Sequence, residues 1–184
     1  MTAPKGTGTQ PDHKYAQNRT APAQGDQQFE FRGGGTVTKT ITVRAGREHA
    51  FAVFTERFFT WWPESHHIGD ADLADAIIEP REGGRWYERG VDGSECDWGQ
   101  VLAWEPPGRL VLSWHLQGDW HYDPDPAKAS EIEVRFVAES ADVTRVELEH
   151  RHLERHDEPE EVRSGIDSPG GWSGILAAYA EQAA

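Results

Sequence analysis

The sequence has few positive charges and no long apolar run, and each shortage excludes a class of protein. Its 184 residues carry 18 lysines and arginines against 32 aspartates and glutamates, a formal net charge of −14. Such acidity repels nucleic-acid phosphates and anionic lipid headgroups, so we expect no nucleic-acid partner and no membrane partner. No apolar stretch reaches the roughly 20 residues that a membrane-spanning helix needs.

Cysteine is also scarce, and its scarcity bears on the compartment. Cys96 is the single cysteine, so no intramolecular disulfide can form, which is usual for a reducing compartment. The N-terminal residues lack the basic-then-apolar order of a secretory signal. The sequence therefore predicts a cytoplasmic protein.

Large apolar side chains are almost absent from the first part of the chain. Residues 1–28 are rich in Thr, Gln, Pro, Gly and Ala, and Tyr15 is their only aromatic residue. Such a segment cannot bury enough surface to offset its chain entropy. We expect residues 1–28 to be a disordered tail and residues 29–184 to form a single domain, a length that suits one domain.

The remaining sequence alternates between the periodicities of strands and helices. Thr36–Val43 is a β-branched alternation typical of a strand, and Arg47–Phe59 has apolar residues at helical spacing before Pro63 ends the pattern. Short strand patterns separated by turns follow, at residues 74–79, 85–89, 95–104, 109–116, 131–137 and 144–152.

The last predicted element is a helix with one apolar face. Ser168 is a suitable N-cap, and Trp172, Ile175, Leu176 and Tyr179 repeat at i, i+3, i+4 and i+7. Two strand patterns, 131–137 and 144–152, have one apolar and one charged face. The expected fold is α+β: a curved antiparallel sheet of six or seven strands around a long C-terminal helix, with a short N-terminal helix pair closing one end.

Several spaced strings resemble those of a known family. They are Glu79–Trp86, Asp92-Gly93, Trp98–Val101, Trp104–Leu110, Ser113-Trp114, Val146–His150 and Gly170–Trp172 with Leu176. Together they resemble the SRPBCC (START/Bet v 1-like) superfamily and, within it, the heat-shock protein 90 ATPase activator homologue-like family, over about residues 36–181. The resemblance implies the helix-grip fold, with a cavity between sheet and terminal helix that in relatives often holds an apolar or amphipathic ligand.

Eight tryptophans are the main candidates for the wall of such a cavity, because aromatic walls with a few polar groups are typical of ligand sites. Core packing explains the same residues equally well. We expect Trp61, Trp62 and Trp120 to lie on loops at the mouth. The predicted ligand-binding residues are Trp61, Trp62, Trp86, Trp114, His150, Trp172 and Tyr179.

The histidines suggest a polar group in that cavity and not a metal site. On an extended strand His150 and His152 point to the same side, and His156 follows closely, but the spacing matches no recognised zinc motif. We therefore expect no metal and no cofactor. An inward His150 is expected to hydrogen-bond a ligand and to titrate near neutral pH.

Acidic residues leave an enzymatic role open. Glu79, Glu88, Glu95 and Asp97, with His115, lie on predicted strands, where two carboxylates in a cavity serve as general acid and base. Alternation assigns the acidic residues of the last two strands to solvent: Glu131, Glu133, Glu147 and Glu149. The facing of residues 95–104 stays ambiguous, no triad is visible, and no catalytic residue is predicted.

Three functions are therefore compatible with the sequence. The leading hypothesis is a protein that binds a small hydrophobic or aromatic ligand between the sheet and the C-terminal helix. The first alternative is a chaperone-ATPase activator-like module that binds a protein partner through its acidic surface. The second is a polyketide cyclase- or hydrolase-like enzyme, since some superfamily members fold and dehydrate polyketide chains in such a cavity.

Overall fold

The computed structural model describes residues 35–184, which lie within one compact unit of the chain. The predicted disordered tail, residues 1–28, and the predicted start of the domain at residue 29 lie outside the described residues. Within residues 35–184 no helix has both the length and the apolar character needed to cross a membrane.

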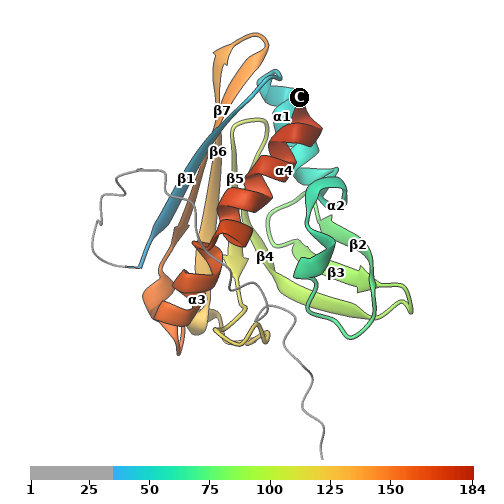
Figure 1. Ribbon diagram of the computed structural model, residues 1–184, viewed down its shortest axis with the longest axis vertical. Coiled ribbons are helices and arrows are strands. Elements are labelled where there is room, and N and C mark those ends of the chain that lie inside the picture. Colours follow the sequence, from blue (N-terminus) through green and yellow to red (C-terminus); the bar gives the residue numbers. More distant parts are fainter. Residues whose placement is uncertain (1–34) are drawn as a thin grey trace, which may run out of the picture. The chain divides into compact units, whose positions relative to one another are not determined.

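A single antiparallel sheet of seven strands curls around the C-terminal helix, as expected (Figure 1). The strand order is β1-β7-β6-β5-β4-β3-β2, so β1 and β2 form the two edges. The strands are β1 (Val37–Val43), β2 (Leu73–Ile78), β3 (Arg85–Gly90), β4 (Glu95–Glu105), β5 (Arg109–Trp114), β6 (Ser130–Ser140) and β7 (Val143–Arg151).

The helices pack on the inner face of this sheet. Helix α4 (Gly174–Ala183) contacts β1, α1 (Arg47–Thr55) and α2 (Phe58–Trp61), and Figure 1 shows it crossing the sheet diagonally. The helical pattern over residues 47–59 forms the expected pair of short helices, and the two are separate because Arg57 leaves helical geometry with φ −109° and ψ 26°. A further helix, α3 (Pro159–Ile166), was not predicted.

The terminal helix begins with a kinked turn. Pro169–Ser173 form a π-helical turn, η5, inside which Gly171 has non-helical geometry. A Cβ atom on Gly171 would lie 2.2 Å from the backbone oxygen of Ile166, so only glycine fits there. The kink places Trp172 against the sheet, although α4 itself starts two residues later.

Strand alternation separates the core from the outer face as the sequence predicted. Ile132, Val134 and Phe136 of β6 are buried and pair in register with His150, Leu148 and Val146 of β7. Three further short helical turns complete the described structure: η2 (Glu64–His66), η3 (Pro126–Lys128) and η4 (Leu153–Arg155).

A close approach between β4 and β5 depends on a glycine. The register of the β3–β4 pair shifts next to Trp86, whose indole Nε1 donates to the Ser113 oxygen at 2.9 Å. A Cβ atom on Gly99 would lie 1.9 Å from that same oxygen and 2.5 Å from Trp86 Nε1. Gly99 therefore leaves the space in which this buried hydrogen bond forms.

Replacing Gly99 with alanine is expected to lower the free energy of unfolding by about 2 kcal/mol or more, because the added methyl group must displace backbone. Chemical denaturation measures the change. Gly170→Ala is the matched control, since a Cβ atom there has no neighbour within 4 Å. An unfolding free energy equal to that of the parent for Gly99→Ala would contradict this account.

Candidate functional site

The aromatic residues predicted as cavity walls are all buried in the core. Their exposed fractions are 3% for Trp61, 6% for Trp62, 1% for Trp86, 5% for Trp114, 0% for His150, 3% for Trp172 and 0% for Tyr179. They come from α2, the residue after it, β3, β5, β7, η5 and α4. Elements far apart in the sequence thus meet in one aromatic cluster.

Four indoles of this cluster contact one another in a closed circuit. Ring centroids are 6.4 Å apart for Trp62 and Trp86, 5.9 Å for Trp86 and Trp114, 6.1 Å for Trp114 and Trp172, and 6.3 Å for Trp172 and Trp62. We call these four residues the indole circuit. Aromatic pairs at such distances contribute about 0.5–1.5 kcal/mol each beyond the area they bury.

Two of the predicted residues lie beside the indole circuit and not within it. Trp61 and Tyr179 pack on each other, with ring centroids 5.3 Å apart, and both contact Phe54 of α1. The Tyr179 hydroxyl donates to the Ala50 oxygen at 2.8 Å, and burial raises the pKa of this phenol. This pair ties α4 to the first two helices.

Of the three residues expected on loops at the mouth, Trp61 and Trp62 are buried, and Trp120 lies on a loop. Trp61 ends α2 instead of lying on a loop, and Trp62, the residue after the helix, is also buried. Trp120 is half-buried with a positive φ of 66°. Its ring covers Gly165 of α3, where a Cβ atom would lie 2.5 Å from it.

Trp98 belongs to the cluster and was missed by the sequence analysis. Its ring is 1% exposed and lies 5.1 Å from Trp62 and 5.3 Å from Trp86, centroid to centroid. The ambiguous facing of residues 95–104 hid it, since the irregular β3–β4 register breaks the simple alternation there. An irregular register cannot be read from one strand alone.

His150 joins the aromatic cluster to a buried chain of hydrogen bonds. Trp172 Nε1 donates to His150 Nδ1 at 3.1 Å, and an indole nitrogen can only donate. The neutral imidazole therefore carries its proton on Nε2 and donates it to Ser130 Oγ, 2.7 Å away. Burial lowers the pKa of His150 to about 3, so the ring is neutral at pH 7.

The chain of hydrogen bonds continues from Ser130 to His156, in the segment after β7. Because Ser130 Oγ accepts from His150, its own proton points to His156 Nε2 at 2.7 Å. His156 Nδ1 then donates to Gln117 Oε1 at 3.2 Å. Burial and the nearby His115 lower the pKa of His156 to about 4. Each group from Trp172 to Gln117 therefore donates to the next one, and no donor in this series is left without an acceptor.

This chain holds the site together and does not present a nucleophile. Ser130 and His156 have the spacing of a nucleophile and its base, but Ser130 is 0% exposed. Both ring nitrogens of His150 are bonded within the protein, and its pKa of about 3 shows that the expected titration near neutrality is wrong. Its ring instead packs on Trp114, with centroids 5.4 Å apart.

The expected common face of His150 and His152 does not form. His152 follows the end of β7 with a left-handed φ of 64°, and its side chain is 38% exposed. Among residues 35–184, no group of three or more histidine, cysteine, aspartate or glutamate side chains is arranged to hold a metal ion.

Glu88 is a buried carboxylate at the edge of the aromatic cluster. Its oxygens accept from the backbone amides of Ile68, at 3.0 Å, and Gly69, at 2.5 Å. Burial raises the pKa of Glu88, and the two amides and the nearby Trp98 indole act in the opposite direction. Glu88 thereby fixes the loop between η2 and β2 against β3.

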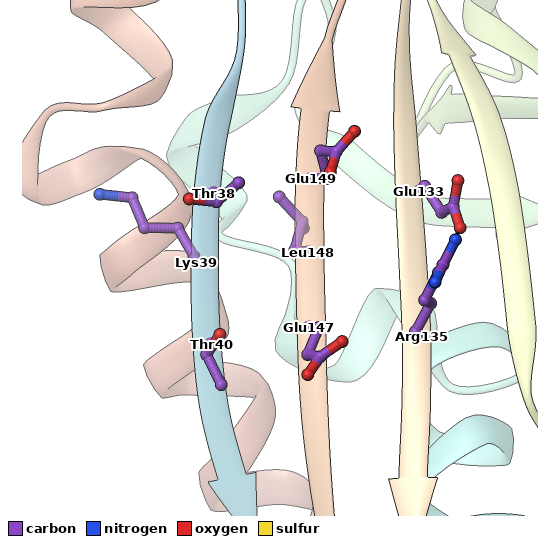
Figure 2. Close-up of a pocket in the computed structure, with 8 residues that line it drawn as sticks. All are labelled: Thr38, Lys39, Thr40, Glu133, Arg135, Glu147, Leu148 and Glu149. Carbon is purple, nitrogen blue, oxygen red and sulfur yellow. The ribbon is translucent and has the colours of Figure 1, made fainter. Parts of the chain in front are cut away.

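The outer face of the sheet carries charges in place of rings. Figure 2 shows a hollow there, lined by side chains of β1, β7 and β6, among them Thr38, Glu133, Arg135 and Glu149. Its charged lining differs from the apolar wall expected around an aromatic ligand. We therefore place the candidate site on the inner face.

One acidic residue of the outer face is not solvated as expected. Glu133 is only 3% exposed, because arginine side chains cover it. Burial alone would raise its pKa, but bonds from Arg109, at 3.1 Å, Arg135 and Arg151 lower the pKa to about 2. The carboxylate is ionised and paired at neutral pH.

The two neutral histidines make a prediction about pH. Unfolded histidines bind protons below pH 6.5, whereas folded His150 and His156 stay neutral to about pH 3 and 4. Stability is therefore lost as the pH falls from 6.5 toward about 4 for His156 and about 3 for His150, by up to about 1.4 kcal/mol per pH unit for each histidine. In denaturation at several pH values, His156→Gln is expected to reduce this slope by one such increment.

If the unfolding free energy of His156→Gln changed with pH as steeply as that of the parent, the conclusion that folded His156 stays neutral would be contradicted. Ser130→Ala provides a second check at pH 7. It leaves His150 Nε2–H and His156 Nε2 without a partner, and is expected to lower the free energy of unfolding by about 1–3 kcal/mol.

Two solved structures resemble this protein in both sequence and fold. A search of curated proteins gave no match. Among solved structures, the anthrahydroquino-γ-pyrone synthase Txn09 is 43% identical with a TM-score of 0.58, covering 80% of this chain and 96% of that one. The self-sacrificing resistance protein CalC from Micromonospora echinospora is 33% identical with a TM-score of 0.60, covering 81% and 94%.

The family itself follows from a sequence match that spans most of the chain. Residues 44–178 match the family described as activator of Hsp90 ATPase homolog 1-like protein. The curled sheet, the terminal helix and the buried aromatic cluster all lie within or next to this range. The chain belongs to the activator of Hsp90 ATPase homolog 1-like family and has its SRPBCC-type helix-grip fold.

Proposed function

We propose that this protein binds a small aromatic ligand between the sheet and the C-terminal helix, within the aromatic cluster. The observation that carries the proposal is the indole circuit of Trp62, Trp86, Trp114 and Trp172, with centroids 5.9–6.4 Å apart. Flat indole faces bind flat aromatic ligands by stacking and edge contacts. His150 and Tyr179 complete the wall, His150 by orienting Trp172 and Tyr179 by holding α4.

One of the two relatives described above supports a fused-ring ligand. One is described as an anthrahydroquino-γ-pyrone synthase and the other as a self-sacrificing resistance protein. Because this chain is 43% identical to the synthase over 96% of the synthase's length, we extend the synthase's fused-ring ligand class to it. We therefore propose a hydrophobic, polycyclic aromatic compound of the polyketide type.

Access to the cluster is proposed through the segment between Trp62 and β2. This segment is held by side chains and not by strand pairing: Glu88 binds the amides of Ile68 and Gly69, and His66 Nε2 donates to the Gly170 oxygen at 2.8 Å. Because the indole rings already touch, ligand uptake requires this segment to move.

The single cysteine fits a reducing compartment, and we place the function in the cytoplasm.

A ring-forming enzyme is the second candidate function, favoured by one observation. Glu88 is 3% exposed, has a raised pKa and lies beside the aromatic cluster, as a general acid or base in an apolar site does. A protein-binding role like that of the chaperone activator remains the third proposal. Its net charge of −14 would then give salt-sensitive association with a basic partner.

Titration with dihydroxyanthraquinone, followed by quenching of tryptophan fluorescence, tests the binding proposal. Trp172→Phe removes part of the indole circuit and its hydrogen bond to His150, and is expected to weaken binding by about tenfold or more. Trp104→Phe is the matched control, because Trp104 is half-buried and packs on Phe51 outside the circuit. Unchanged affinity in folded Trp172→Phe would contradict the proposal.

A further inference from the structure

Two indole N–H groups in the aromatic cluster are buried without a hydrogen-bond partner. Across the described residues, only Trp62 Nε1 and Trp98 Nε1 are side-chain nitrogen or oxygen atoms of this kind. The other buried indoles are all bonded: Trp61 to Val53 O, Trp86 to Ser113 O, Trp114 to Leu116 O and Trp172 to His150 Nδ1. Buried polar groups in folded proteins nearly always have partners, so two exceptions require an explanation.

The two unpaired donors belong to the same place in the core. The Trp62 and Trp98 rings lie 5.1 Å apart, centroid to centroid, and are tilted by 39°. Trp62 follows α2 and Trp98 lies on β4, so the chain brings them together from separate elements. Both unpaired donors therefore belong to two rings that pack on each other.

The nearest carboxylate does not fill this role. The Trp98 indole is among the hydrogen-bonding groups that lower the pKa of the Glu88 carboxyl, but no acceptor lies within hydrogen-bond distance and angle of Trp98 Nε1, so this contact does not satisfy the donor. The Glu88 oxygens are occupied by the amides of Ile68 and Gly69. A buried acidic group beside Trp98 also disfavours an anionic ligand atom at this point.

We propose that Trp62 Nε1 and Trp98 Nε1 form an oxygen-recognition subsite that donates two hydrogen bonds to a neutral carbonyl or hydroxyl oxygen of a fused-ring aromatic ligand. This inference rests on the proposed function and adds which ligand atom the protein recognises by hydrogen bonding. Two donors on apolar walls select an oxygenated ring over a bare hydrocarbon, because the hydrocarbon leaves both donors unpaired.

Paired probes test the subsite. Dihydroxyanthraquinone carries ring oxygens, and anthracene has the same three-ring outline without them. Trp62→Phe and Trp98→Phe keep an aromatic ring and remove the N–H donor. Each is expected to weaken dihydroxyanthraquinone binding by about fivefold, the loss of one hydrogen bond, while anthracene affinity changes by less than about twofold. Trp104→Phe is the control and is expected to change neither affinity.

The probe pair separates failure of the subsite from failure of the proposed function. If Trp62→Phe and Trp98→Phe weakened the binding of both probes equally, the subsite would be overturned. That result would mean that the two rings only pack against the ligand, or that water is the missing acceptor. Binding of neither probe to the parent protein would overturn the proposed function and the subsite with it.

Two further measurements cover the case in which a phenylalanine variant fails to fold. Benzothienylalanine at position 62 or 98 replaces the N–H with sulfur at nearly unchanged shape, and the same fivefold selective loss is expected. In nuclear magnetic resonance spectra of the eight indole N–H groups, the Trp62 and Trp98 signals are expected to shift downfield with dihydroxyanthraquinone and not with anthracene. Shifts confined to other indoles would overturn the assignment.

Discussion

The hydrogen bond from Trp172 Nε1 to His150 Nδ1 is the contact on which the interior of this protein depends. It connects the kinked start of the terminal helix to β7, the strand next to the edge strand β1. Because the indole can only donate, it also determines the tautomer of His150 and the direction of every later bond through Ser130 and His156. A single donor thus orients both the aromatic cluster and the polar chain behind it.

Buried polar groups on the two faces of the sheet differ in charge, being ionised on the outer face and neutral on the inner face. On the outer face, Glu133 stays ionised because three arginines neutralise it, with a pKa of about 2. On the inner face, His150 and His156 stay neutral, with pKa values of about 3 and 4. Burying a charge without a partner is costly, so these two imidazoles stay neutral and are satisfied by hydrogen bonds. An interior of this kind suits a neutral ligand better than an ionised one.

Sequence reasoning succeeded where one element decides its own structure. The alternation around Ile132 and Val146 predicted β6 and β7, since one side of each strand must be apolar. It failed where a second element intervenes. Helix α3 was missed because only Val162 and Ile166 are buried in it. Trp98 was missed because the irregular register of β3 on β4 decides its facing.

Composition and periodicity by themselves determined the acidic surface, the antiparallel sheet, the terminal helix and the identity of most aromatic residues in the cluster. They could do so because charge, alternation and helical spacing are local properties. Only the tertiary structure decided that His150 donates to a serine and not to a ligand, and that Trp62 and Trp98 keep free N–H groups. Hydrogen bonding of a buried group depends on which atoms other elements bring within about 3 Å, and no single segment of sequence contains that information.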